Sequence, residues 1–106
     1  MEVRDIDEFT KGWFIGNFEP TMLKTLELEV GVKFFLEGDT EPLHKQLIAI
    51  EFTVVISGEI RINGTKFTRG QIIKIDPEEP ADFLALTDAS LLCLKTPSIP
   101  SDRVVL

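Results

Sequence analysis

Three side chains that could bind a metal ion or move a proton lie close together in the stretch LHKQLIAIE. His44 is the only histidine of the chain, Gln46 follows two residues later, and Glu51 follows after five more. If this stretch is a β-strand, His44 and Gln46 point to the same side, because side chains alternate along a strand. An imidazole, an amide and a carboxylate on one surface suit metal binding, ligand binding or acid–base chemistry.

The rest of the chain predicts that strands position these residues. Short runs rich in β-branched and aromatic residues alternate with turn residues, and only residues 5–9 favour a turn of helix. Asn63-Gly64 is a strong hairpin signal, because both residues accept positive φ angles. No crossover helix separates the runs, which predicts an all-β, antiparallel barrel or sandwich. The expected strands cover residues 13–18, 25–38, 44–50, 51–67, 71–76, 81–87 and 90–95.

Alternation within the runs predicts which faces are buried. In residues 26–30, leucine and valine alternate with Glu27 and Glu29, so the glutamates are expected on the outer face. Residues 52–56 and 90–94 are apolar on both faces. Such strands are expected between two layers or against a partner subunit.

Single residues in these runs are interpreted from their surroundings. Cys93 lies in an apolar run without a neighbouring histidine, so it is expected to be a small core residue. Trp13 is expected in the core or at an interface. Lys33 and Lys95 are expected to be ordinary solvated charges.

Length, composition and charge limit the possible partners. The 106 residues suit one domain covering 1–106, and 43% of them are hydrophobic. The formal net charge of −7 disfavours binding to nucleic acids and to anionic membranes, because like charges repel. No apolar run approaches the ~20 residues that cross a bilayer, and the charged start does not resemble a signal peptide. A single cysteine fits a reducing, cytoplasmic location.

The stretch from Gly38 to Gly58 resembles the first motif of the cupins. That motif is a glycine, five residues, His-x-His, three or four residues, a glutamate, six residues and a glycine. Here Gly38 is followed after five residues by His44-Lys45-Gln46, then after four by Glu51 and after six by Gly58. Every spacing fits, and one identity differs, since Gln46 stands where the second histidine would be.

The second cupin motif is much less well matched. It is a glycine, five residues, Pro-x-Gly, two residues, a histidine, three residues and an asparagine. Gly70 fits, but Asp76-Pro77-Glu78 stands in place of Pro-x-Gly, and Ala81 and Ala85 replace the histidine and the asparagine. The resemblance implies a small antiparallel β-barrel, or jelly roll, that encloses a pocket.

The resemblance also implies a metal site that has lost part of its ligand set. His44, Gln46 and Glu51 would be the remaining metal ligands, and Ala81 offers none. An amide oxygen is a poorer ligand for transition metals than an imidazole. The expected cofactor is therefore none, or a weakly bound divalent metal ion.

Two interpretations of the polar residues stay open. In the first, His44, Gln46 and Glu51 line a pocket with Thr53, which shares the face of Glu51, and Phe83, which shares the face of Ala81. In the second, the three polar side chains satisfy one another by hydrogen bonds inside the barrel.

The leading functional hypothesis is binding of a small molecule, such as a sugar or another polar metabolite, by a homodimer. The main alternative is a metal-dependent oxygenase or isomerase that uses His44, Gln46 and Glu51. A metal-free sugar isomerase or epimerase, with His44 or Glu51 as base, is a further alternative. A structural module whose pocket is filled by its own side chains is the third class.

Overall fold

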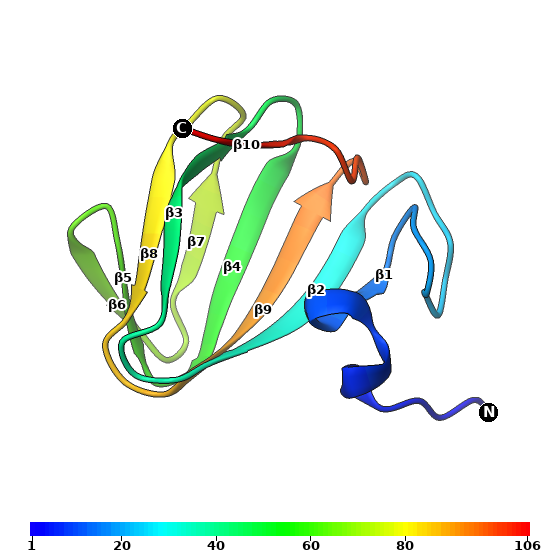
Figure 1. Ribbon diagram of the computed structural model, residues 1–106, viewed down its shortest axis with the longest axis horizontal. Helices are drawn as coiled ribbons and strands as arrows, with labels where there is room; N and C mark the ends of the chain where they lie inside the picture. The colour runs from blue at the N-terminus through cyan, green and yellow to red at the C-terminus, as the bar shows by residue number, and fades with distance from the viewer.

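The chain folds into two β-sheets that face each other, with two short 3-10 turns near the N-terminus (Figure 1). The computed structural model describes residues 1–106. The elements are η1 (Ile6–Glu8), η2 (Thr10–Gly12), β1 (Trp13–Ile15), β2 (Glu29–Phe35), β3 (Thr40–Gln46), β4 (Ile50–Ser57), β5 (Glu59–Ile62), β6 (Thr65–Thr68), β7 (Ile72–Ile75), β8 (Ala81–Ala85), β9 (Ala89–Thr96) and β10 (Arg103–Val105).

The strands pass repeatedly from one sheet to the other. The first sheet has the order β1-β2-β9-β4-β7, and the second sheet has the order β10-β3-β8-β5-β6. All pairings between these strands are antiparallel. Strands β2, β4, β7 and β9 lie in the first sheet, whereas the strands that follow each of them lie in the second. The predicted antiparallel jelly roll is confirmed.

The predicted Asn63-Gly64 hairpin joins β5 to β6. Asn63 and Gly64 have φ angles of 50° and 80°, as a tight two-residue turn requires. The hairpin is tied to β8 by a reciprocal pair of hydrogen bonds. The Asp82 amide donates to Asn63 Oδ1 at 3.0 Å, and the Asn63 amide donates to Asp82 Oδ1 at 2.7 Å. Asp82 therefore points away from the core, while Ala81 and Phe83 beside it are buried.

The hydrophobic core occupies one end of the space between the sheets. Nine buried residues form it, and Val55 and Ile60 are almost completely enclosed. Phe35 of β2 and Phe83 of β8 join the two sheets there, with ring centroids 4.4 Å apart. This apolar cluster joins the two sheets, and several of its members also line the cavity that holds the polar side chains.

The predicted outward position of Glu29 was wrong. Glu29 is only 5% exposed, whereas Leu26 and Phe34 are 67% and 68% exposed. Glu29, Lys33 and Phe35 share one face of β2 by alternation, and that face points between the sheets. The strand follows the expected period of two, but its polar face is the inner one.

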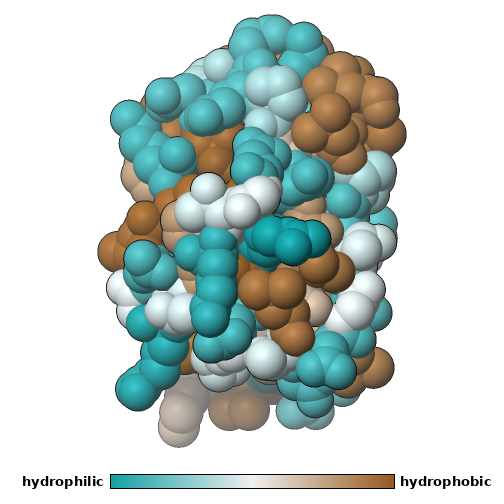
Figure 2. Space-filling model, turned by 90° about the vertical axis from the view of Figure 1, so that its left-hand side faces the viewer, coloured by the Kyte–Doolittle hydropathy of each residue, from teal (hydrophilic) through white to brown (hydrophobic).

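The outer face of the first sheet carries apolar side chains. Val54 on β4 is paired with Leu92 on β9 and Ile72 on β7, and all three alternate with inward-pointing residues. Ile72 and Phe34 at the borders of this face are 66% and 68% exposed. Figure 2 shows a different side of the molecule, nearest β5 and β6, where hydrophilic residues predominate between separate hydrophobic patches. No helix has the length and apolar character needed to span a membrane.

Candidate functional site

A cavity of about 970 Å³ lies between the two sheets. Strands of both sheets line it, together with residues of η1 and η2. Figure 1 shows these turns in front of β2, beside the space between the sheets. The interior is therefore not filled by the protein's own side chains, and its volume suits a small-molecule site.

Four of the five side chains predicted to surround a pocket line this cavity. They are His44 on β3, Glu51 and Thr53 on β4, and Phe83 on β8. Gln46 does not line it: the residue is 2% exposed, and neither its amide nitrogen nor its amide oxygen has a hydrogen-bond partner. An unpartnered amide in the interior is costly, because burial removes its hydrogen bonds to water.

The hypothesis that the three polar side chains satisfy one another was wrong. His44 Nδ1 lies 2.9 Å from the carbonyl oxygen of Pro42, while Gln46 has no partner. Since a carbonyl only accepts, Nδ1 must donate, which leaves Nε2 of a neutral His44 as an acceptor. No hydrogen bond links His44, Gln46 and Glu51 to one another.

A bulge in β3 explains how the second sheet presents its polar residues. Glu41 pairs with Phe83 and His44 pairs with Ala81, so three steps along β3 match two steps along β8. The extra residue lets Glu41 and His44 both line the cavity despite their odd spacing. Glu41 accepts a hydrogen bond from Arg103 on β10, with an N–O distance of 3.4 Å.

The side chains present do not fit a tightly held metal ion. No group of three or more histidine, cysteine, aspartate or glutamate side chains is placed to hold one. His44 and Glu51 line the cavity, but Gln46 does not, and Ala81 has no ligand atom. Lys95 is the cross-strand partner of Glu51, so its positive charge lies on the same wall. That charge opposes a cation beside Glu51.

Sequence reasoning missed Trp13, Lys33 and Lys95. All three line the cavity, and the lysines are not ordinary solvated charges. Their Nζ atoms lie 4.8 Å (Lys33) and 5.0 Å (Lys95) from the centre of the Trp13 ring, within cation–π distance. The signal was present in the sequence: Lys95 is two residues after Cys93, which was expected inside, so alternation puts both on one face.

The charged groups of the cavity differ in their burial and in their hydrogen-bond partners. Burial lowers the pKa of the Lys33 ammonium below its ordinary value; Cys93 and Glu41 act against this shift, and the charge of Lys95 adds to it. Glu29 accepts a hydrogen bond from the Ser98 hydroxyl at 3.1 Å. Glu51, Lys33 and Lys95 form no ion pair or side-chain hydrogen bond. These three charged groups thus stand in the cavity without a salt-bridge or hydrogen-bond partner in the protein.

Cys93 is predicted to be chemically inert. It is 5% exposed, and burial, followed by the negative charge of Glu51, raises the pKa of its thiol to about 12. Because the thiolate is the reactive form, almost none is present at pH 8. Ellman's reagent should label the native protein at least ~100-fold more slowly than the urea-unfolded chain, whose thiol pKa is near 8.5. Equal labelling rates would contradict this burial.

Comparisons with known proteins agree on the architecture. No protein-family model matches the chain, and no curated protein matches it. A double-stranded β-helix protein of Klebsiella pneumoniae, described as uncharacterized, is 20% identical with a TM-score of 0.72, over 99% of this chain and 96% of its own. An RmlC-like cupin from Shewanella frigidimarina is 20% identical with a TM-score of 0.66, over 72% of this chain and 71% of its own.

A third solved structure belongs to an enzyme. The DMSP lyase DddQ from Ruegeria pomeroyi is 18% identical with a TM-score of 0.72, over 88% of this chain. The chain spans about half of that lyase, 49% of its length. Likeness at these identities concerns the backbone and not the activity. Together with the two facing antiparallel sheets and the cavity between them, it identifies the chain as a protein with the cupin fold.

Proposed function

We propose that this chain binds a small polar metabolite in the cavity between its sheets and holds no tightly bound metal ion. The observation that carries the proposal is the set of unpaired charged side chains in the cavity, Lys33, Lys95 and Glu51. Charged groups in a concave, partly dry site need partners, and a ligand is able to supply them. Thr53, Phe83 and His44 would complete the wall around it.

Any bound metal ion is expected to be weakly held. His44 and Glu51 supply two ligands, water would supply the rest, and the lysines of the same cavity oppose a cation. Native mass spectrometry with elemental analysis of the purified protein tests whether a small molecule is bound and whether a metal ion is tightly held. We expect a small-molecule adduct and no stoichiometric metal. A metal ion at one per chain that survives dialysis against a chelator would overturn the proposal and favour a metal-dependent enzyme.

Gln46 does not line the cavity, but it shares a face of β3 with His44 and its buried amide lacks any partner within the chain, so we propose that a bound ligand or a bridging water molecule reaches it. Gln46→Leu should leave the melting temperature equal to or above that of the wild type, since a buried unsatisfied amide is replaced by an apolar group of similar size. The same change should weaken binding of the copurified ligand by about 1–3 kcal/mol, the cost of one lost hydrogen bond. Calorimetric titration and thermal unfolding measure the two effects.

The opposite pair of results would remove Gln46 from the site. A less stable Gln46→Leu variant with unchanged ligand affinity would mean that the amide serves the fold, through a buried water molecule. Leu43→Met is a matched control, because Leu43 lies on the same strand, is 43% exposed and does not line the cavity. It should change neither quantity.

A second candidate function is metal-free proton transfer, as in a sugar isomerase or epimerase. It is favoured by the hydrogen bond from His44 Nδ1 to the Pro42 carbonyl, which fixes the ring and leaves Nε2 as a base. Deuterium incorporation into the bound ligand from D₂O would favour this function. A ligand recovered unlabelled would favour simple binding.

We further propose that the protein is a cytoplasmic homodimer whose interface is the outer face of the first sheet. Apolar strand faces left open by one chain are commonly covered by a symmetric partner. Val54→Glu would put a charge at the centre of this face. Sedimentation should then show the wild type at twice the 11.9 kDa of one chain and the variant near 11.9 kDa.

Arg61→Glu is the control for this experiment. Arg61 lies on β5 of the other sheet and is exposed, so the variant should remain dimeric. A wild type that sediments as a single chain at micromolar concentration would overturn the dimer.

A further inference from the structure

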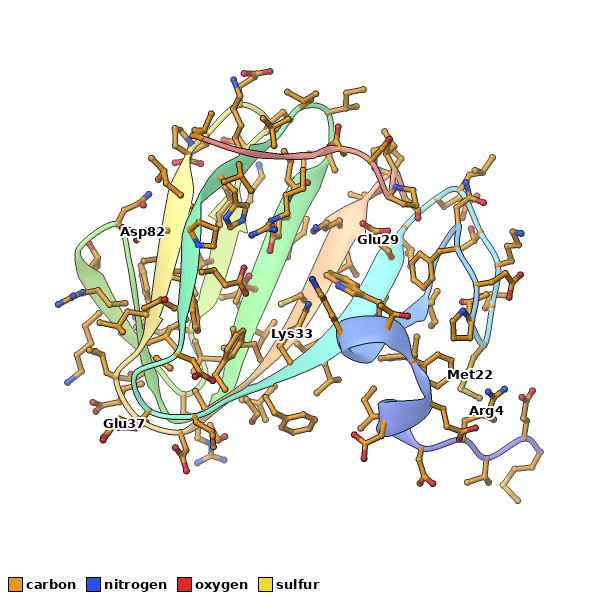
Figure 3. The ribbon with its side chains drawn as sticks, viewed as in Figure 1. Arg4, Met22, Glu29, Lys33, Glu37 and Asp82 are labelled. Atoms are coloured by element: carbon orange, nitrogen blue, oxygen red, sulfur yellow. The ribbon has the colours of Figure 1, made fainter.

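Lys33 and Lys95 place two ammonium groups beside one indole ring inside the cavity. Lys33 lies on β2 and Lys95 on β9, and the two strands are hydrogen-bonded neighbours. Their Nζ atoms lie 4.8 and 5.0 Å from the centre of the Trp13 ring. Figure 3 labels Lys33 on the same strand as Glu29, the buried carboxylate of β2.

Gly31 makes this arrangement possible. Gly31 pairs with Trp13 on β1 and with Cys93 on β9. Along the sheet it therefore lies midway between the position of Lys33 and that of Lys95, which pairs with Glu29. A Cβ atom at position 31 would come within 2.7 Å of the Trp13 ring. The missing side chain therefore lets the indole lie flat against β2, within reach of both lysines.

Neither ammonium group forms a salt bridge in the chain, although the negative charge of Glu41 acts on Lys33. Cross-strand register places Lys95 between Glu29 and Glu51, yet no carboxylate oxygen lies within 4.0 Å of its Nζ or of Lys33 Nζ. Glu29 is instead bonded to Ser98, and Glu41 to Arg103. The indole face attracts both cations, but it accepts no conventional hydrogen bond from their six N–H groups.

Two like charges in a partly dry site raise the free energy of the empty protein. Burial is the main cause of the lowered pKa of Lys33, and the charge of Lys95 contributes to it. A negatively charged ligand group near both nitrogens would relieve the repulsion and satisfy the free N–H groups.

We propose that Lys33 and Lys95 form a subsite for the carboxylate of a hydroxy acid that binds in the cavity. The inference rests on the proposed function, because it names the class of ligand for the same site. Glu51, Glu41 and Glu29 also line the cavity, so they would repel a second anionic group and accept hydrogen bonds from hydroxyls. The ligand is therefore a monocarboxylate with several hydroxyl groups beyond the carboxylate end.

The test compares gluconate with sorbitol by calorimetric titration. The two open-chain molecules have the same carbon skeleton and differ in whether the first carbon is a carboxylate or an alcohol. Wild type should bind gluconate at least ~10-fold more tightly than sorbitol, the usual effect of a charge-assisted hydrogen bond. Lys33→Met and Lys95→Met should each reduce gluconate affinity ~10-fold or more and leave sorbitol affinity unchanged.

Lys66→Met is the control, because Lys66 on β6 is exposed and pairs with Glu59 at 3.3 Å, outside the cavity. It should change neither affinity. The cavity variants should fold, since each removes a charge that forms no salt bridge and loses only a cation–π contact with Trp13, and thermal unfolding checks this. The carboxylate subsite would be overturned if the wild type bound gluconate and sorbitol equally well. It would also be overturned if both lysine variants bound gluconate as tightly as the wild type. Either result would still be compatible with ligand binding in the cavity. Failure of wild type to bind either compound would overturn the hydroxy-acid class, while a different copurified adduct would still support the proposed function.

Discussion

Gln46→His combined with Ala81→His should bind Zn²⁺ or Ni²⁺ more tightly than the wild type by roughly two orders of magnitude or more, because affinity follows the number and type of ligands. Ala81 pairs directly with His44 across β3 and β8, and alternation puts position 46 on the same face as His44, although the Gln46 side chain itself is buried and does not line the cavity. The two new imidazoles would join His44 and Glu51 in a set of three nitrogens and one carboxylate. Calorimetric titration with each metal measures the change.

The single variants serve as controls for the metal experiment. Each adds one imidazole and should raise affinity by less than the pair does. Lys95 is the cross-strand neighbour of Glu51, and its positive charge opposes a metal cation there. Adding Lys95→Met to the double variant should therefore raise its metal affinity further. A folded double variant that binds no metal would mean that these positions do not converge, and the similarity to the cupin metal motif would then be limited to backbone spacing.

Asp102→Ala should lower the free energy of unfolding by about 3 kcal/mol, because one buried and one partly buried backbone donor lose a charged acceptor. Asp102 is 3% exposed, and its carboxylate accepts hydrogen bonds from the amides of Ile48 and Ala49 at 2.8–3.0 Å. These amides belong to the turn between β3 and β4, which separates Gln46 from Glu51. Urea unfolding measures the loss.

Two further aspartate variants separate this effect from loss of charge alone. Asp102→Asn keeps one acceptor oxygen and should lose less stability than Asp102→Ala. Asp88→Ala removes an exposed carboxylate that accepts one hydrogen bond, from the Glu37 amide at 2.8 Å, and should cost under about 1 kcal/mol. Equal losses in Asp102→Ala and Asp88→Ala would contradict the role of Asp102.

The fold could be predicted from local signals that the tertiary structure does not change. Asn63-Gly64 has a conformation that few other residue pairs accept, so its hairpin is fixed by the two residues themselves. Strand alternation within β8 likewise places Ala81 and Phe83 inside and Asp82 outside, as expected. The spacing from Gly38 to Gly58 indicated the cupin architecture.

The charged residues of the cavity were missed because the alternation of side chains separates the two faces of a strand but does not say which face points inward. On β2, the usual assumption that apolar residues point inward put Glu29 and Lys33 in solvent. The fold reverses this assumption on β2, where Glu29 and Lys33 lie on the inner face and Phe34 is exposed on the outer face. Glu41 was missed for another reason: the strand was expected to begin at His44, whereas β3 begins at Thr40 and carries a bulge beside Pro42 that breaks the period of two.

Nuclear magnetic resonance can test ligand binding in the cavity most directly, because His44 and Trp13 are the only histidine and the only tryptophan of the chain. They lie on β3 and β1, in opposite sheets, and both line the cavity. During titration with gluconate or sorbitol, the imidazole and indole signals should shift together and saturate at one ligand per chain. Saturable binding detected by calorimetry that leaves both signals unmoved would contradict binding between the sheets.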